Sequence, residues 1–310
     1  MIKKTVCFSN PVYLSKKDMQ LKMDFPGNES EANNPALERT SIPIEDIGVI
    51  ILEDHQITLT TGLLAALLEN NCAVITCDSS HMPAGLFLPL ETNSLQSKRF
   101  REQIEASKPL LKQLWQQTIS AKIKNQGALL AEGGKNFKNM LIWSEKVKSG
   151  DSSNLEGRAA AYYWKNIFPE ELDFARDRNG LPPNNLLNYG YAILRAVVAR
   201  GLTGSGLIPA LGIHHQSQYN AYCLADDIME PYRPYVDFVV LGIINNGEDF
   251  EELSPSVKKQ LLGIPALTVK INGEKSPLMV AVSRTTSSLV KCYSGESRKI
   301  LYPEFAAPGN

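Results

Sequence analysis

The chain has 310 residues, 43% of them hydrophobic, and a formal net charge of −1. This length exceeds a typical single domain and predicts two domains. No apolar run is long enough to cross a membrane, and the balanced charge confines any nucleic-acid-binding surface to a local basic patch.

The cysteines and the first residues indicate the compartment. Five cysteines are scattered without any C-x-x-C spacing, which favours reduced thiols and argues against a zinc ribbon. Residues 1–7 include lysines but no apolar core of a signal peptide. We therefore expect a cytoplasmic protein.

Residues 1–94 are predicted to form a β-rich domain. Alternating or continuous apolar runs predict strands at 6–8, 13–14, 20–25, 47–52 and 72–77. A helix is expected over 59–68, capped by Thr60 or Thr61. Residues 27–34 are polar and predicted to form a loop, and Pro83 and Gly85 are expected to interrupt regular structure.

Residues 95–310 are predicted to be an all-α domain, so the fold class is α+β. One long amphipathic helix is expected over 96–125, with Phe100, Ile104, Leu111, Leu114, Trp115 and Ile119 on its inner face. Basic residues are interspersed along it: Lys98, Arg99, Arg101, Lys108, Lys112, Lys122 and Lys124. Further helices are predicted at 136–147, 155–167, 186–201, through the central stretch to 244, and at 254–262 and 278–293.

The central stretch, residues 212–234, carries the densest chemistry. His214 and His215 are followed by three carboxylates on a predicted helix, of which Asp227 and Glu230 share a face. Pro231 predicts a kink at Glu230. Imidazole beside carboxylate suits a divalent ion such as manganese and tolerates magnesium. The alternative is a packed histidine beside a solvated acidic face.

A second candidate site lies in residues 151–164, where the start of a helix is predicted. Asn154 or Ser153 can cap this helix, which places Glu156 in its first turn. The alternative to a functional role is structural, because the helix dipole by itself favours an acidic residue in the first turn. Gly157 inside a helix costs about 1 kcal/mol against alanine, which indicates a close approach by another helix or a phosphate.

The third candidate is the turn-rich loop 176–185. Arg176 and Arg178 on a segment stiffened by two prolines suit contacts with phosphates, although a plain helix connector explains the loop equally well. His55 and His81 are interpreted as structural or surface residues. A zinc site from His214, His215 and Cys223 lacks an evident fourth ligand, and no pattern marks Cys223 as an activated nucleophile.

In combination and order, these motifs resemble one family, the CRISPR-associated integrases, which are the first and near-universal Cas proteins. The resemblance spans nearly the whole chain and rests on residues 154–160, on Pro182-Pro183 leading to residues 189–191, and on residues 212–215 through 227–234. Residues 114–126, with residues 82–85 before them, most resemble members from Cas9-type (type II) systems.

The resemblance implies a site. It assigns one Mg²⁺ or Mn²⁺ to Glu156, His215 and Glu230, with Asp227 as the runner-up for the last ligand. Arg158, Arg176, Arg178 and Arg233 are expected to contact DNA.

The resemblance also implies a function. The family joins the 3′-hydroxyl ends of captured double-stranded DNA into the CRISPR repeat, which is spacer acquisition. It forms a homodimer through the N-terminal domain and a heterohexamer with the small partner "Cas two", with other type II adaptation proteins as further partners. A metal-dependent nuclease without an integration role and a non-catalytic DNA-binding scaffold remain as alternatives.

Overall fold

The computed structural model describes residues 3–26 and 41–306 and divides into two compact units, one ending at Thr92 and the other beginning at Asn93. This division falls close to the expected boundary after residue 94. The predicted polar loop at 27–34 lies outside the described residues.

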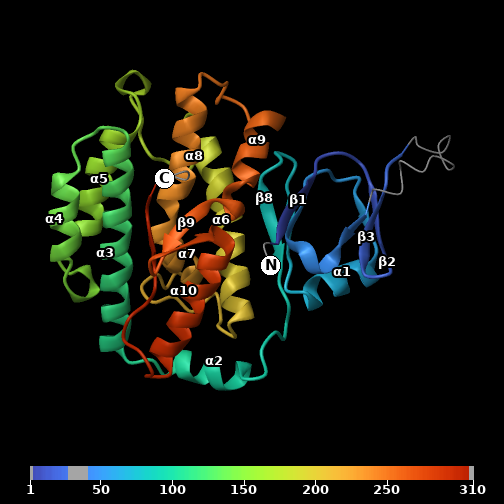
Figure 1. Cartoon of the computed structure of the whole chain (residues 1–310), viewed down its shortest axis with the longest axis horizontal. Helices are drawn as coiled ribbons and strands as arrows, with labels where there is room; N and C mark the ends of the chain where they lie inside the picture. The colour runs from blue at the N-terminus through green and yellow to red at the C-terminus, as the bar shows by residue number, and fades with distance from the viewer. Residues whose placement is uncertain (1–2, 27–40, 307–310) are drawn as a thin grey trace. The chain divides into compact units, whose positions relative to one another are not determined.

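In its described residues, the first unit contains two four-stranded sheets and one α-helix (Figure 1). One sheet has the order β1-β5-β7-β8, in which β8 alone runs antiparallel to its neighbour, and the other has the order β4-β3-β2-β6. The bounds are β1 Lys4–Phe8, β2 Tyr13–Lys17, β3 Gln20–Asp24, β4 Ser41–Pro43, β5 Ile47–Leu52, β6 Thr58–Leu59, α1 Thr61–Glu69, β7 Ala73–Cys77 and β8 Pro83–Phe87.

The apolar runs of this unit form its core, as their patterns predict. Leu14, Leu21, Ile50 and Leu67 are fully buried together, so both sheets and α1 contribute to one cluster. Thr60 caps α1 by accepting a hydrogen bond from the Leu63 amide. The expected interruption at Pro83 is wrong, because residues 83–87 pair with β7 at the edge of the sheet, where proline is tolerated.

The second unit is mainly helical, and α6 is its most buried long helix. The bounds are α2 Gln96–Ile104, α3 Lys108–Glu132, α4 Lys138–Lys146, α5 Leu155–Ile167, α6 Asn184–Gly204, α7 Cys223–Met229, α8 Arg233–Asn245, α9 Pro255–Leu262 and α10 Leu278–Tyr293. Within the described ranges, no helix is long and apolar enough to cross a membrane.

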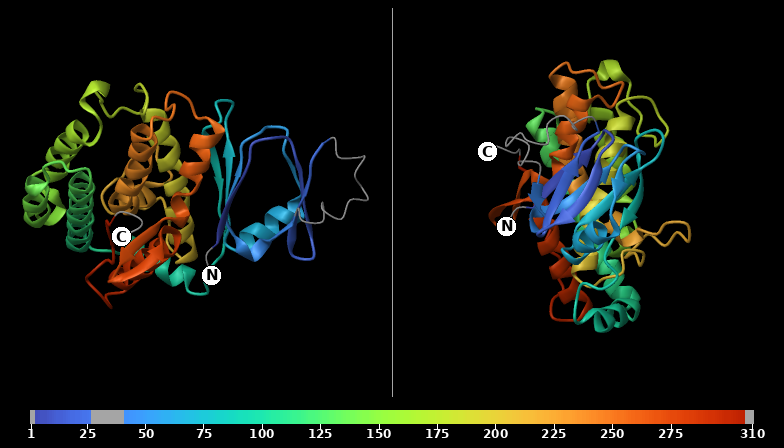
Figure 2. Two further views of the ribbon diagram at one scale, coloured as in Figure 1. Left: turned by 45° about the horizontal axis from the view of Figure 1, so that its top comes forward. Right: turned by 90° about the vertical axis from the view of Figure 1, so that its right-hand side faces the viewer.

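The single long helix expected over 96–125 is wrong. Helix α2 ends at Ile104, and a separate helix, α3, begins after its cap Ser107. Pro109 lies in the first turn of α3, where a residue needs no amide donor. Ile104 is 65% exposed rather than on an inner face, whereas Trp115 and Ile119 are buried. Figure 2 shows α3 as a long, straight helix beside α4 and α5.

The prediction of an all-α second domain is also wrong. A three-stranded antiparallel sheet of order β10-β9-β11 lies in this unit (Figure 2). Its strands are β9 Thr268–Ile271, β10 Glu274–Pro277 and β11 Pro303–Glu304. Ile271 pairs with Pro303, so this sheet brings the end of the described chain back to the residues just before α10.

Candidate metal centre

The helical stretch around residue 230 breaks where Pro231 predicts. A short 3₁₀ turn, Glu230–Tyr232, separates α7 from α8. Asn125 of α3 fixes this turn, because its side-chain amide donates to the Pro231 carbonyl at 2.7 Å and to the Pro303 carbonyl at 3.0 Å. Glu230 is thereby held against α3, and it is only 4% exposed.

Two side chains before α5 hold Glu156 in the first turn. Asn154 adopts a left-handed conformation and accepts a hydrogen bond from the Gly157 amide. Asp151 accepts from the amides of Leu155 and Glu156, both at 2.9 Å. A Cβ on Gly157 would lie 2.8 Å from the Asn154 side chain. The close approach at Gly157 is therefore made by the cap of its own helix, and not by another helix as expected.

Lys122 of α3 joins the two glutamates. Its ammonium donates to Glu156 Oε1 at 2.7 Å and lies 2.7 Å from Glu230 Oε2. Glu230 Oε2 is therefore buried against the Lys122 ammonium, whereas no backbone amide of the described residues donates to it. A buried carboxylate oxygen whose partner is a cation is suited to a cation.

The pKa directions agree with this arrangement. Burial alone would lower the pKa of Lys122, but Glu230 and Glu156 outweigh burial and raise it. Burial would raise the pKa of Glu230, but Arg233 and Lys122 outweigh it and lower that pKa. Arg233 pairs with the other oxygen, Glu230 Oε1, at 3.0 Å. The centre therefore combines two carboxylates with two basic side chains.

Asp227 shapes the loop that carries the histidines. It is fully buried and its Oδ2 accepts from the amides of Ile213 and His214, at 2.6 and 2.9 Å. Its Oδ1 accepts from the His215 amide and from His215 Nδ1. The loop is so tight that a Cβ on Gly212 would meet the His215 carbonyl at 2.1 Å. Both oxygens of Asp227 are thus engaged by the protein.

This hydrogen bond sets the state of His215. An ionised carboxylate only accepts, so Nδ1 carries the proton and Nε2 offers a lone pair. The bond to Asp227 raises the pKa of His215 against the effect of burial, and Asp227, Glu230 and Glu156 raise it further by their charges. The His215 side chain is 46% exposed, so its ring remains accessible.

His214 serves a different purpose. Its ring stacks on Trp115 of α3 with centroids 4.2 Å apart and planes nearly parallel. Trp115 also meets the edge of the His215 ring at 5.6 Å. This packing holds the loop against α3 and indicates that His214 is the structural member of the pair.

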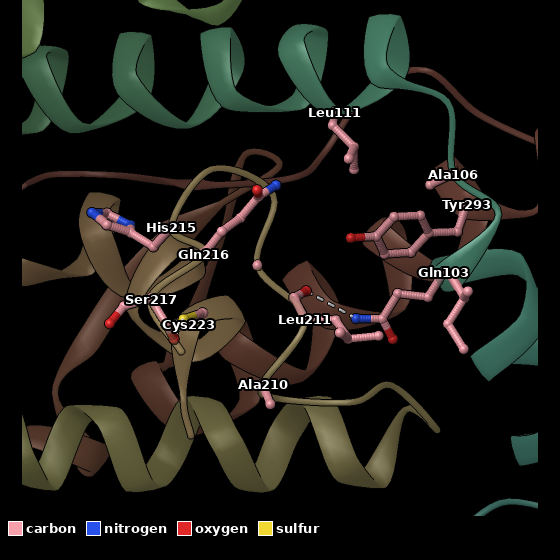
Figure 3. A pocket seen from close by; sticks show the side chains of 12 residues that line it. Gln103, Ala106, Leu111, Ala210, Leu211, His215, Gln216, Ser217, Cys223 and Tyr293 are labelled. Carbon is pink, nitrogen blue, oxygen red and sulfur yellow. Dashed lines mark hydrogen bonds between the residues drawn. The ribbon is translucent and has the colours of Figure 1, made fainter. Parts of the chain in front are cut away.

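A pocket of about 330 Å³ opens beside His215 (Figure 3). His215, Gln216, Ser217 and Cys223 lie at one end, and Leu111 and Tyr293 lie toward the other. The Gln103 side chain donates to the Leu211 carbonyl at its edge.

The four arginines expected to contact DNA differ in their surroundings. Arg158 is exposed on α5 and lies over the Trp143 ring at 4.7 Å, and Arg178 is exposed in the loop before α6. Arg176 donates to Asn184 and Asn188, so it holds that loop together. Arg233 pairs with Glu230 and lies 4.8 Å from the Tyr191 ring centroid.

The other candidates have surroundings that differ from those of a metal ligand. Cys223 is buried and its thiol lies against the carbonyls of Ser217 and Asn220. In the first unit, the rings of His55 and His81 stack, and His81 pairs with Glu53 at 3.4 Å. In the part of the chain that the structure describes, no three His, Cys, Asp or Glu side chains already surround one point as metal ligands would.

Comparison with known proteins decides the family. The sequence matches the family described as CRISPR associated protein Cas1 over residues 6–258, which is most of the chain. The chain belongs to the Cas1 family. It is 38% identical over 253 residues to a CRISPR-associated endonuclease Cas1 from Neisseria meningitidis serogroup C, covering 81% of this chain and 82% of that protein.

Solved structures show that the fold is shared. A casposase bound to an integration product superposes with a TM-score of 0.75 at 21% identity, covering 97% of this chain and 92% of that one. A chain of a Cas6-RT-Cas1–Cas2 complex superposes with a TM-score of 0.72 at 20% identity, covering 98% of this chain and 36% of that longer one. The mixed α/β fold, with strands first and helices after, is therefore a Cas1 fold.

Sequence reasoning missed two residues that build the centre, Asp151 and Lys122, and one contact of a third, Trp115. A carboxylate just before a helix start, such as Asp151, is a capping signal. Lys122 is predicted only as one of several basic residues interspersed along a helix. Its position three residues after the inward-facing Ile119 was the available signal that it faces the core. Trp115 was predicted to be buried, but its stack with His214 could not be foreseen.

Proposed function

We propose that this Cas1 protein is a metal-dependent DNA integrase of CRISPR spacer acquisition. It joins the 3′-hydroxyl ends of captured double-stranded DNA into the CRISPR repeat by transesterification, and it cleaves DNA when water replaces the hydroxyl. The observation that carries the proposal is the convergence of Glu156 and Glu230 on one buried cation, with His215 contributing to the same electrostatic field.

The donor set fits a divalent ion. Glu156, Glu230 and His215 Nε2 supply two carboxylates and one imidazole, which suit Mn²⁺ and accommodate Mg²⁺. Glu230 Oε2, which faces Lys122 and is not the oxygen paired with Arg233, is the oxygen best prepared for it. Both oxygens of Asp227 already accept hydrogen bonds, from the loop amides and from His215 Nδ1. We therefore assign Asp227 the role of orienting the imidazole and keep Glu230 as the ligand.

When bound, the ion stabilises the charge that develops on the phosphoryl oxygens and lowers the pKa of the attacking hydroxyl. The chain supplies the rest. Asp151 and Asn154 hold Glu156 in place, and Asp227 keeps the proton on Nδ1 of His215 so that Nε2 faces outward. Arg233 stays beside Glu230 and adds positive charge where a phosphate would lie.

The proposed partners follow from the reaction and from the similar structures. Double-stranded DNA is the substrate, with Arg158 and Arg178 exposed for phosphate contacts. One centre makes one joint, so insertion of a duplex requires a second copy, and a homodimer through the first unit supplies it. A similar structure is a Cas6-RT-Cas1–Cas2 complex, which supports Cas2 as a partner, and we propose that the assembly is a heterohexamer. Type II adaptation proteins are proposed as further partners.

A half-site integration assay tests this function. The full chain, with Cas2, is given pre-processed DNA ends and a repeat-containing target in Mn²⁺ or in EDTA. An integrase yields joined product only with metal. Cleavage without joining would favour the plain nuclease, and DNA binding that is insensitive to EDTA without any product would favour the scaffold.

A further inference from the structure

The centre already contains a cation that belongs to the protein. Lys122 is 8% exposed, and its ammonium lies 2.7 Å from one oxygen of Glu156 and 2.7 Å from one oxygen of Glu230. Among the lysines of α3 this burial is unusual, since Lys112 and Lys124 are both exposed. The side chain is thus directed inward between the two acids.

The position of this ammonium conflicts with a metal ligated by the same two acids. A divalent ion bound to both carboxylates needs the space between them and repels a positive charge at that distance. Glu230 Oε1 is already paired with Arg233, so Oε2, which faces Lys122, is the oxygen left for a ligand. The Lys122 ammonium and a divalent ion therefore compete for Glu230 Oε2, and the ammonium also contacts Glu156 Oε1.

We propose that Lys122 is the internal competitor of the metal: its ammonium neutralises Glu156 and Glu230 in the metal-free protein, and a divalent ion binds by displacing it. The inference rests on the proposed metal centre and adds a residue to it. It has two consequences. Lys122 stabilises the metal-free fold, because a buried carboxylate without a partner is costly. Lys122 also weakens metal affinity, because the ion must first break both contacts.

A lysine side chain is well suited to displacement. It carries four methylene groups with several rotatable bonds, so the ammonium can move while the backbone of Lys122 stays fixed in α3. An arginine or a second metal ligand in this position would be less easily displaced. The shared carboxylates make the coupling between ammonium and metal negative and reciprocal.

Calorimetric titration of the full chain with Mn²⁺, at fixed pH and salt, tests the proposal. The variants are Lys122→Met, Lys122→Gln, which keeps amide donors for the carboxylates, and Lys124→Met as the exposed control on the same helix. We expect both Lys122 variants to bind Mn²⁺ more tightly than the wild type by roughly 5- to 150-fold, a usual range for coupled sites. The control should match the wild type.

Thermal unfolding gives a second readout that is independent of catalysis. In EDTA the Lys122 variants should unfold at a lower temperature than the wild type, and saturating Mn²⁺ should close that gap. A variant that folds only when Mn²⁺ is present supports the proposal, since the metal then replaces the ammonium. A variant that fails to fold in both conditions contradicts it.

The failure of this inference differs from the failure of the proposed function. If the wild type binds Mn²⁺ in a Glu156-dependent way but both Lys122 variants bind with equal or lower affinity, the competitor role is wrong and the metal centre stands. If the wild type shows no Glu156-dependent binding, the metal centre itself is wrong, and the inference falls with it.

Discussion

Replacing Asp227 by asparagine removes the acceptor that organises the histidine loop. The carboxylate accepts from three backbone amides and from His215 Nδ1, two donors on each oxygen. Asparagine has one accepting oxygen and one donating NH₂ group. Whichever way the amide turns, the NH₂ group therefore faces two donors.

The magnitude follows from the two lost bonds. Hydrogen bonds to a charged group contribute about 1.5–3 kcal/mol each, so two of them amount to about 3–6 kcal/mol. Water at the exposed side of the loop replaces part of this loss. We therefore expect the free energy of unfolding to fall by about 3 kcal/mol, the lower end of this range. For a unit of this size, that corresponds to a fall in the unfolding midpoint of about 6–12 °C.

The same substitution separates the two roles open to Asp227. As the residue that orients His215, its loss should weaken Mn²⁺ binding about 10- to 100-fold while leaving one site per chain. Glu230→Gln, in contrast, should abolish measurable binding. Scanning calorimetry and Mn²⁺ titration on the full chain measure both quantities.

Asp226→Asn is the matched control. Asp226 pairs with Arg195 and accepts from the Asn220 side-chain amide, whereas the backbone amides of Ile213, His214 and His215 donate to Asp227. This variant should lose stability but keep Mn²⁺ affinity. If Asp227→Asn unfolds at the wild-type temperature with unchanged Mn²⁺ affinity, the role assigned to Asp227 is refuted.

Four further outcomes are expected. Glu156→Ala should abolish strand transfer but retain duplex binding in a mobility-shift assay, since affinity depends on many phosphate contacts; equal loss of both would contradict this. His215→Ala should remove activity and weaken Mn²⁺ binding, whereas His214→Ala should mainly lower stability. If calorimetry shows weaker Mn²⁺ binding only in His214→Ala, the ligand is His214 and not His215. Burial raises the pKa of Asp237 from 3.8 to about 6. The folded state therefore binds this proton more tightly, and wild-type stability falls by about 3 kcal/mol as pH rises from about 4 to 6. Asp237→Asn should lack that component, and a pH-independent difference between the two proteins would contradict it. Light scattering of the full chain should show a homodimer, and a monomer at micromolar concentration would contradict the proposed assembly.

The sequence predicted those parts of the fold that depend on local chemistry. The helix at Leu155–Ile167 has the predicted bounds because Asn154 is a strong cap, and the turn at Glu230–Tyr232 follows from Pro231. The break before α3 was missed, since Ser107 and Pro109 sit inside an unbroken apolar pattern and act as a helix start only in context.

The features that escaped prediction differ in their cause. The strand Thr268–Ile271 pairs with Glu274–Pro277 across the two-residue turn Asn272-Gly273, a local hairpin signal that was overlooked. Its second partner, Pro303–Glu304, lies beyond an entire helix and has no local signal. The spacing from Ile119 indicates that Lys122 faces the core, but its ion pairs form only because α3 packs against α5 and against the Glu230 turn. Its partners could not be identified from spacing along the chain.

The central claim is one divalent ion held by Glu156, His215 and Glu230. A crystal structure of the full chain grown with Mn²⁺, with anomalous diffraction measured at the manganese edge, tests it most directly. The account predicts a single strong anomalous peak bonded to both glutamates and to His215 Nε2, with Asp227 still on Nδ1 and the Lys122 ammonium moved away. A peak bonded to Asp227 or His214 instead, or no peak between the two glutamates at saturating Mn²⁺, would contradict it.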